Sequence, residues 1–131
     1  MKKLIALSAL SLFMASAYAT NHCPAGQTCT YPIGTGQNDK TIYFTELQPG
    51  NLYRCSFYEK QINAIVEVRN PVATAGVKIL WNGYTRLPAI VMVDTKAVPA
   101  GQKTGNAAWF TFKAVGLGFG NTMTLQCAVV K

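Results

Sequence analysis

The chain contains a single histidine and only five acidic residues among its 131 residues. Catalysis by an activated serine or cysteine needs a histidine held in a cleft, whereas His22 stands close to the start of the expected mature chain. The carboxylates are scattered along the sequence: Asp39, Glu46, Glu59, Glu67 and Asp94. On strands we expect each of them to face solvent rather than to form an acid–base pair. These shortages predict a protein that is not an enzyme and uses no cofactor.

Helical periodicity and basic clusters are missing as well. Beyond residue 19 no stretch repeats apolar side chains with a 3.6-residue period, so we expect almost no helix. The twelve lysines and arginines give a net charge of +7, but they form no tract typical of nucleic-acid binding. The glycine-rich run at 116–120 lacks the lysine of a phosphate-binding loop and joins two strand-like segments. We therefore expect no nucleic-acid partner.

The N-terminal residues have the pattern of an export signal. Residues 2 and 3 are lysines, residues 4–14 are uncharged and mostly apolar, and residues 17–19 read Ala-Tyr-Ala. This pattern predicts a signal peptide over 1–19 and a single exported domain over 20–131. The apolar run is shorter than the roughly 20 residues of a membrane-spanning helix, so no anchor is expected after cleavage. Loss of two lysines lowers the net charge from +7 to +5. We expect a secreted or periplasmic protein.

Four cysteines in a short exported chain predict two disulfides. Cys23 and Cys29 flank a turn-forming spacer, which favours a small ring between them. Cys55 and Cys127 each lie on the apolar side of an alternating run, and their spacing is compatible with a bridge between two sheets. A zinc site that includes His22 is the alternative for the first pair, but five residues between cysteines is not a usual ligand spacing.

Alternating patterns and β-branched or aromatic residues predict seven strands: 41–47, 52–58, 62–69, 77–82, 85–94, 107–115 and 122–130. The residues expected to face inward include Tyr53, Cys55, Phe57, Ala108, Phe110, Phe112, Ala114, Met123, Leu125, Cys127 and Val129. About seven short antiparallel strands predict an all-β, disulfide-stabilised β-sandwich, immunoglobulin-like or jelly-roll-like, with a small barrel as second choice.

Turn residues indicate how these strands are connected. The strands at 52–58 and 62–69 are predicted to form a hairpin, and Asn82-Gly83 is typical of a second hairpin turn. Pro88 indicates an edge or a bend inside its strand. Loops are expected at 31–40, at the Asn70-Pro71 break and at 95–106, the longest and the one we predict to be mobile.

The residues suggest two hypotheses about a functional site. Cleavage after Ala19 would leave Thr20-Asn21-His22 at the N-terminus, where one amine, two amides and the His22 imidazole could hold Cu(II) or Ni(II) in a square plane. The second hypothesis is a binding surface of exposed aromatic and basic side chains: Tyr58, Tyr84, Arg86, Trp109 and Lys113. Its alternative is that both faces of these strands are partly covered.

Function is therefore expected to be binding rather than catalysis. The first hypothesis is a non-catalytic binding or structural domain of the bacterial envelope or extracellular space, which recognises a protein or an envelope polymer through a sheet face and the 95–106 loop. An inhibitor of an envelope-attacking enzyme is an alternative: Tyr53-x-Cys55 and a cysteine near the C-terminus resemble periplasmic lysozyme inhibitors over those few residues, although a basic chain suits a basic partner poorly. A surface-fibre subunit joined by strand addition is another alternative.

Overall fold

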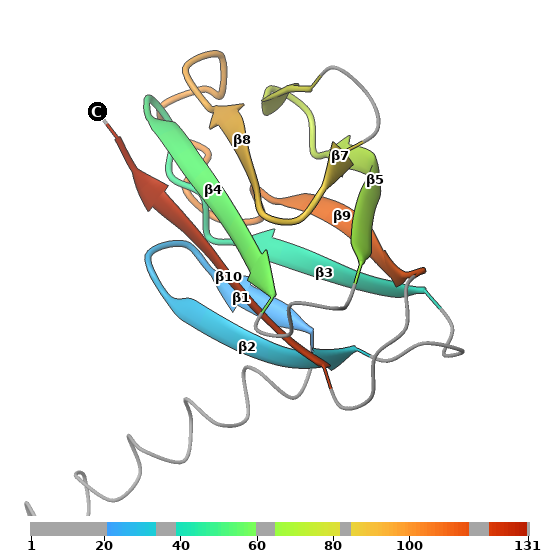
Figure 1. Ribbon diagram of the computed structural model, residues 1–131. Helices are drawn as coiled ribbons and strands as arrows, with labels where there is room; N and C mark the ends of the chain where they lie inside the picture. The colour runs from blue at the N-terminus through green and yellow to red at the C-terminus, as the bar shows by residue number, and fades with distance from the viewer. Residues whose placement is uncertain (1–20, 34–38, 60–64, 82–84, 116–120, 131) are drawn as a thin grey trace, which may run out of the picture.

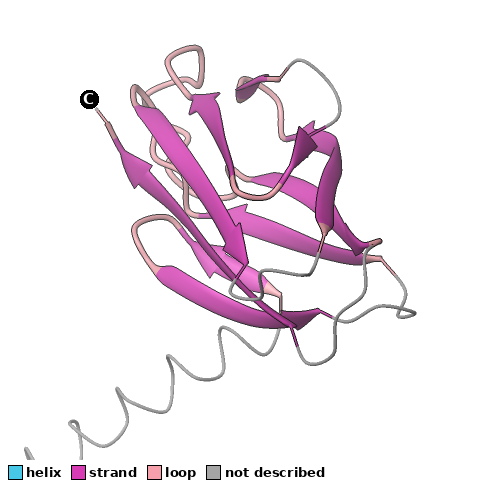
Figure 2. Ribbon diagram, viewed as in Figure 1, coloured by secondary structure: helices cyan, strands magenta, loops and turns pink. Residues whose placement is uncertain are grey.

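The computed structural model describes residues 21–33, 39–59, 65–81, 85–115 and 121–130, which contain strands and no helix (Figures 1 and 2). The strands form two five-stranded sheets that pack against each other around one core. Sheet A has the order β1-β3-β9-β5-β7, and sheet B has the order β2-β10-β4-β8-β6. The predicted all-β, disulfide-stabilised sandwich is confirmed, and the described strands do not close into the alternative barrel.

The described ranges contain ten strands where the sequence predicted seven. Sheet A consists of β1 (His22–Pro24), β3 (Lys40–Thr45), β9 (Ala108–Ala114), β5 (Val66–Ala73) and β7 (Thr85–Arg86). Sheet B consists of β2 (Thr28–Ile33), β10 (Asn121–Val129), β4 (Leu52–Glu59), β8 (Ala89–Asp94) and β6 (Lys78–Leu80). β1 and β2 were not predicted, and β7 and β8 together correspond to the single strand predicted at 85–94.

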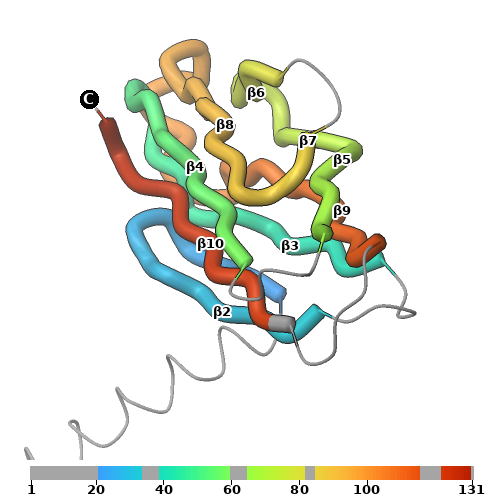
Figure 3. The backbone as a smooth tube through the Cα atoms, viewed as in Figure 1, coloured from blue at the N-terminus to red at the C-terminus, as the bar shows by residue number. Residues whose placement is uncertain are grey.

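Successive strands of the described ranges belong to different sheets: the odd-numbered strands form sheet A and the even-numbered strands form sheet B. Figure 3 shows how the chain switches layers repeatedly along its length. The predicted hairpin of 52–58 with 62–69 is therefore wrong: β4 pairs with β10 and β8, and β5 pairs with β9 and β7. This alternation also distinguishes the fold from an immunoglobulin domain, whose consecutive strands A and B share a sheet.

The predicted strand at 85–94 is divided by a change of sheet. The Leu87–Pro88 peptide bond is cis and separates β7, which pairs with β5 in sheet A, from β8, which pairs with β4 and β6 in sheet B. The bend expected at Pro88 is confirmed. Residues 82–84, and with them the predicted Asn82-Gly83 turn, lie outside the described residues.

Three further sequence expectations are wrong for identifiable reasons. Part of the loop predicted at 31–40 belongs to β2, an edge strand that tolerates Pro32 because one side of it needs no ladder hydrogen bonds. β1 runs parallel to β3, so the sheets are not purely antiparallel. The break predicted at Asn70-Pro71 is a bulge inside β5: Asn70 has φ 54°, and the pairing with β9 shifts between Arg69 and Val72.

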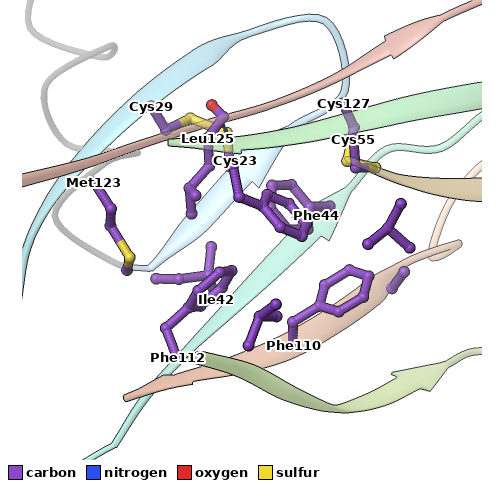
Figure 4. Packing of buried hydrophobic residues seen from close by; sticks show 14 of the residues in the cluster. Cys23, Cys29, Ile42, Phe44, Cys55, Phe110, Phe112, Met123, Leu125 and Cys127 are labelled. Carbon is purple, nitrogen blue, oxygen red and sulfur yellow. Dashed lines mark hydrogen bonds between the residues drawn. A yellow bond between two sulfur atoms is a disulfide. The ribbon is translucent and has the colours of Figure 1, made fainter. Parts of the chain in front are cut away.

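The centre of the core is a cluster of four phenylalanines contributed by both sheets. Phe57 of β4 packs against Phe44 of β3 and against Phe110 and Phe112 of β9, with ring centroids 5.2 to 5.7 Å apart. All four side chains are fully buried, and Figure 4 shows three of them between the layers. Burying each ring contributes about 1.5 to 3 kcal/mol, so the cluster holds the two sheets together.

The closing strand β10 occupies a central place in sheet B, between β2 and β4. Met123, Leu125 and Cys127 point into the core as predicted (Figure 4). Val129 was predicted to share that face but is 54% exposed. Val129 is the last residue of β10 and forms the last pair with β4, although its partner Tyr53 is fully buried.

Both predicted disulfides are present, but their structural roles are the reverse of those expected. Cys55 and Cys127 are directly opposite residues of β4 and β10, with Cα atoms 3.9 Å apart, so this bond lies within sheet B rather than between the sheets. Cys23 of β1 and Cys29 of β2 belong to different sheets, so the small ring is the covalent link between the two layers. Two intramolecular disulfides indicate folding in an oxidising compartment.

The two bonds should differ in their effect on stability. They enclose sequence separations of 72 and 6 residues, for which loop entropy predicts about 4 and about 2 kcal/mol. We expect Cys55→Ser/Cys127→Ser to lower the free energy of unfolding about twice as much as Cys23→Ser/Cys29→Ser, measured by urea titration with circular dichroism. A wild-type midpoint for the first variant would contradict this assignment of stability.

Candidate functional site

An aromatic row crosses three neighbouring strands on the outer face of sheet A. The row comprises His22 of β1, Tyr43 of β3 and Trp109 of β9, which are cross-strand partners in the pairing registers. Their ring centroids are 5.3 Å apart for His22 and Tyr43 and 5.2 Å apart for Tyr43 and Trp109. These distances follow from strand spacing, because side chains at paired positions stand side by side on one face.

The parity of each strand explains why these rings face outward. Their chain neighbours Cys23, Phe44 and Ala108 are fully buried, and successive side chains of a strand point to opposite faces. His22 is exposed, while Tyr43 and Trp109 are partly exposed. Val72 of β5 pairs with Trp109 and extends the row with a side chain that is 44% exposed. The row therefore presents ring surface to solvent along a sheet, not inside a cavity.

Polar side chains lie beside the aromatic row on the same face. The hydroxyl oxygens of Thr41 and Thr111 are 3.3 Å apart, at the next pair of positions along β3 and β9. Arg69 of β5 is the cross-strand partner of Thr111, and its Nη2 donates to Glu67 Oε1 at 2.7 Å. Side chains that can form hydrogen bonds therefore lie next to the aromatic row on the outer face of sheet A.

Three cationic side chains also lie on this face: Arg69, Arg86 and Lys113. We call them the basic group. Glu67 has Arg86 of β7 on one side and Lys113 of β9 on the other in the sheet registers. The sequence predicted a solvent-facing Glu67, but this residue is only 7% exposed. Arg69 binds this carboxylate, and a paired carboxylate can be buried where an unpaired one would have to face solvent. Three cations against one carboxylate leave an excess of positive charge.

The structure brings together only part of the predicted aromatic and basic surface. Arg86, Trp109 and Lys113 share the outer face of sheet A. Tyr58 is 50% exposed as predicted, but it belongs to β4 and therefore to sheet B, so it cannot contribute to the same surface. Tyr84 lies outside the described residues.

Sequence reasoning missed two rings of this face. Tyr43 alternates with the apolar residues Ile42 and Phe44, so the parity of its strand could have revealed it. His22 could not have been placed, because its position depends on the parallel pairing of β1 with β3.

The 95–106 loop is fixed to the rest of the domain at both ends. Thr95 is fully buried, and its hydroxyl donates to the Gln48 carbonyl at 2.6 Å and accepts from the Asn51 N–H at 2.9 Å. At the other end Asn106 is fully buried, and its carbonyl accepts from the Leu47 N–H at 3.2 Å. The predicted mobility of this loop stays a prediction.

The metal hypothesis at the N-terminus stays a prediction too. Thr20, which would supply the amine, lies outside the described residues. The His22 ring packs on Tyr43, and the Asn21 carbonyl accepts from the Tyr43 N–H at 2.9 Å. Within the described ranges no group of three or more His, Cys, Asp and Glu side chains could hold a metal ion.

Copper titration tests this hypothesis directly. If the mature chain begins at Thr20, one equivalent of Cu(II) should produce a visible d–d absorption band of a square-planar nitrogen site. His22→Ala should abolish the band, whereas Tyr43→Ala should retain it because the phenol supplies no ligand. A band that survives His22→Ala would rule out this site.

Among the described residues, the carboxyl of Glu59 has a shifted pKa. Burial raises the pKa of Glu59 at the end of β4, and a hydrogen bond with the Val66 backbone opposes this effect. Glu59 Oε1 is buried and has no hydrogen-bond partner among the described residues. A carboxyl whose pKa is higher in the folded chain favours folding in its protonated form. That contribution is complete below the unfolded pKa of about 4.3 and is lost as the pH rises through the folded pKa.

Replacement of Glu59 should therefore stabilise the protein near neutrality. We expect Glu59→Gln to raise the Tm at pH 7 by up to about 3 °C, because solvent screening limits the effect at a partly exposed group. The difference should vanish below about pH 4. Asp39→Asn removes the same charge from an exposed site and serves as the control in thermal melts. An equal gain at both pH values would contradict the assignment to ionisation.

Comparison with protein-family models, with curated proteins and with solved structures found no match for this chain. The part of the chain that the structure describes has no helix with the length and apolarity needed to cross a membrane.

Proposed function

We propose that this protein is an exported, non-catalytic binding domain that recognises an acidic polysaccharide through the outer face of sheet A. The observation that supports the proposal most directly is the aromatic row beside the basic group on one continuous face. Both the disulfides and the N-terminal pattern support export to the periplasm or the cell exterior.

A flat row of rings suits an extended polymer better than an enclosed small ligand. Aromatic rings present a large, rigid, apolar surface that can pack on the C–H face of a sugar, and the neighbouring hydroxyls can bond its polar edge. The spacing of neighbouring strands makes the row roughly 10 Å long from His22 to Trp109, enough for about two sugar units.

The charge of this face favours an acidic polymer over a neutral one. Arg69, Arg86 and Lys113 outnumber the single carboxylate of Glu67, and Arg86 is exposed. Guanidinium groups bind carboxylates and phosphates through paired hydrogen bonds, and an excess of positive charge speeds encounter with a polyanion. The mature net charge of +5 acts in the same direction.

The fibre and inhibitor alternatives receive no comparable support. Strand addition needs an exposed edge, and β10 is enclosed between β2 and β4. The edge strands β1, β7 and β6 have three, two and three residues and offer a donated strand few pairing positions. The remaining edge strand, β2, has six residues but contains Pro32, which cannot donate to an added strand. No feature of the described surface favours an enzyme as the partner over a polymer.

The proposal is tested by binding assays with matched variants. The mature, oxidised protein should bind alginate or polygalacturonate in affinity electrophoresis and calorimetry, and bind neutral dextran far more weakly. We expect Trp109→Ala to weaken binding at least about tenfold, equivalent to about 1.4 kcal/mol. Arg86→Ala should weaken it a few-fold and reduce its salt dependence, because it removes one exposed charge.

Tyr58→Ala is the matched control, since Tyr58 is an exposed aromatic residue on the outer face of sheet B. It should leave the affinity unchanged. Equal losses for Tyr58→Ala and Trp109→Ala, or no binding by the wild-type protein to any acidic polysaccharide of the panel, would overturn the proposal.

A further inference from the structure

A pocket of about 320 Å³ lies where the disulfide ring between β1 and β2, the connection from β3 to β4 and the end of β10 meet. Its polar lining comes from Glu46, Gln48, Asn51 and Tyr53, and its apolar lining from Ala25 and Val129. Ligand pockets have volumes of roughly 300 to 1,000 Å³, so this one accommodates a single sugar-sized ring and not an oligomer.

The hydrogen bonds around the pocket leave it rich in acceptors. Gln48 Nε2 donates to the carbonyl oxygens of Glu46 and Lys103, each at 3.3 Å, and Asn51 Nδ2 donates to the Tyr53 hydroxyl at 3.4 Å. The NH₂ ends of both amides are thus engaged within the protein, which leaves their carbonyl oxygens to accept. Among the described residues no cation forms an ion pair with the exposed carboxylate of Glu46.

Tyr53 contributes a buried donor to this set of acceptors. Tyr53 is one of the residues that line the pocket, although it is only 1% exposed. Its hydroxyl accepts from the Gln48 N–H at 2.7 Å and from Asn51 Nδ2. Both hydrogen bonds recorded within the described residues use the oxygen as the acceptor, so the hydroxyl proton remains available to a ligand.

The backbone at Glu46 is held in an unfavourable conformation. Its φ of 59° lies in the left-handed region, which residues other than glycine and asparagine rarely adopt. The next residue, Leu47, is fully buried and donates its N–H to the Asn106 carbonyl at 3.2 Å, so the core fixes the turn that presents Glu46. Strained residues of this kind concentrate at binding sites, because packing maintains them at a cost in stability.

We propose that this pocket binds a hexose-sized amino sugar. The ammonium group pairs with the Glu46 carboxylate, sugar hydroxyls donate to the side-chain oxygens of Gln48 and Asn51, and the Tyr53 hydroxyl donates to a sugar oxygen. The apolar contacts of Ala25 and Val129 match the C–H face of a ring. The Tyr53 hydroxyl favours a polyol over a simple alkylammonium ion, because the alkylammonium ion has no oxygen that could accept the hydroxyl proton. This site is separate from the polymer-binding face and does not depend on it.

The test is an NMR titration of the mature, oxidised protein labelled with ¹⁵N. Glucosamine should cause saturable shifts at residues 25–26, 46–53 and 129 with a millimolar Kd, as expected for so small a ligand. Glucose and N-acetylglucosamine, which lack the ammonium group, should bind at least fivefold more weakly. Ethylamine, which lacks the hydroxyls, should also bind at least fivefold more weakly.

Substitutions of the pocket residues show which side chain makes each contact with the sugar. Glu46→Gln keeps the shape of the side chain and should reduce glucosamine binding to the level of glucose, and Tyr53→Phe should weaken all the sugars. Asp39→Asn removes a negative charge elsewhere and should leave the affinity unchanged. Glu46→Asn should raise the Tm while it abolishes the preference for the amine, because asparagine tolerates the left-handed conformation.

Three results would overturn the proposal: no saturable shifts around the pocket, equal affinity for glucosamine and N-acetylglucosamine, or equal affinity for glucosamine and ethylamine. Thermal melts of Glu46→Gln and Tyr53→Phe separate a lost contact from a lost fold, and a Glu46→Gln protein with wild-type Tm and wild-type affinity would also overturn it. None of these outcomes depends on whether the outer face of sheet A binds a polysaccharide.

Discussion

Packing between the two layers is the interaction on which the rest of this structure depends. Since successive strands always belong to different sheets, no local hairpin can hold either sheet together before the layers meet. Phe57 of sheet B contacts Phe44, Phe110 and Phe112 of sheet A, and these rings join segments that are far apart in the sequence. Register within each sheet is then fixed by which face of each strand the cluster buries, because a slip of one residue would expose that face.

The same physics explains which features were predictable from the sequence. Inward positions such as Phe57, Phe110 and Leu125 were predicted correctly, because alternation along a single strand is a local signal. The pairing partners of the strands were not predicted correctly. Hairpin signals report only local turn chemistry, and among the described strands no two successive ones pair. The pairing of Cys55 with Cys127 was predicted correctly, because each cysteine lies on the apolar side of its own alternating strand. Its placement between the sheets was wrong, because strand order is a property of the whole fold.

The candidate binding surface was also predictable only as far as local alternation allows. Outward parity identified Tyr58 and Trp109 equally well, because alternation cannot indicate which of two sheets a strand belongs to. Only the register places Trp109 beside Tyr43 and the basic group, and Tyr58 on the opposite layer. The two outer faces consequently differ in arrangement: sheet A sets neighbouring rings in one row beside cations, whereas sheet B carries Tyr58 among exposed apolar side chains such as Leu80 and Ile90. The sequence pattern alone does not distinguish them.

The small disulfide ring between Cys23 and Cys29 positions β1 and the neighbouring turn more strongly than its short length suggests. Cys23 lies between His22 of the aromatic row and the Ala25–Gly26 turn beside the pocket, and its bond to Cys29 ties this three-residue strand to the opposite sheet. A strand this short has few ladder hydrogen bonds of its own, so its place beside β3 depends on the bond and on contacts such as that of the Gly26 N–H with the Cys127 carbonyl at 2.8 Å. The disulfide with the smaller expected contribution to global stability can therefore position both proposed binding regions, because local order and overall free energy are separate quantities.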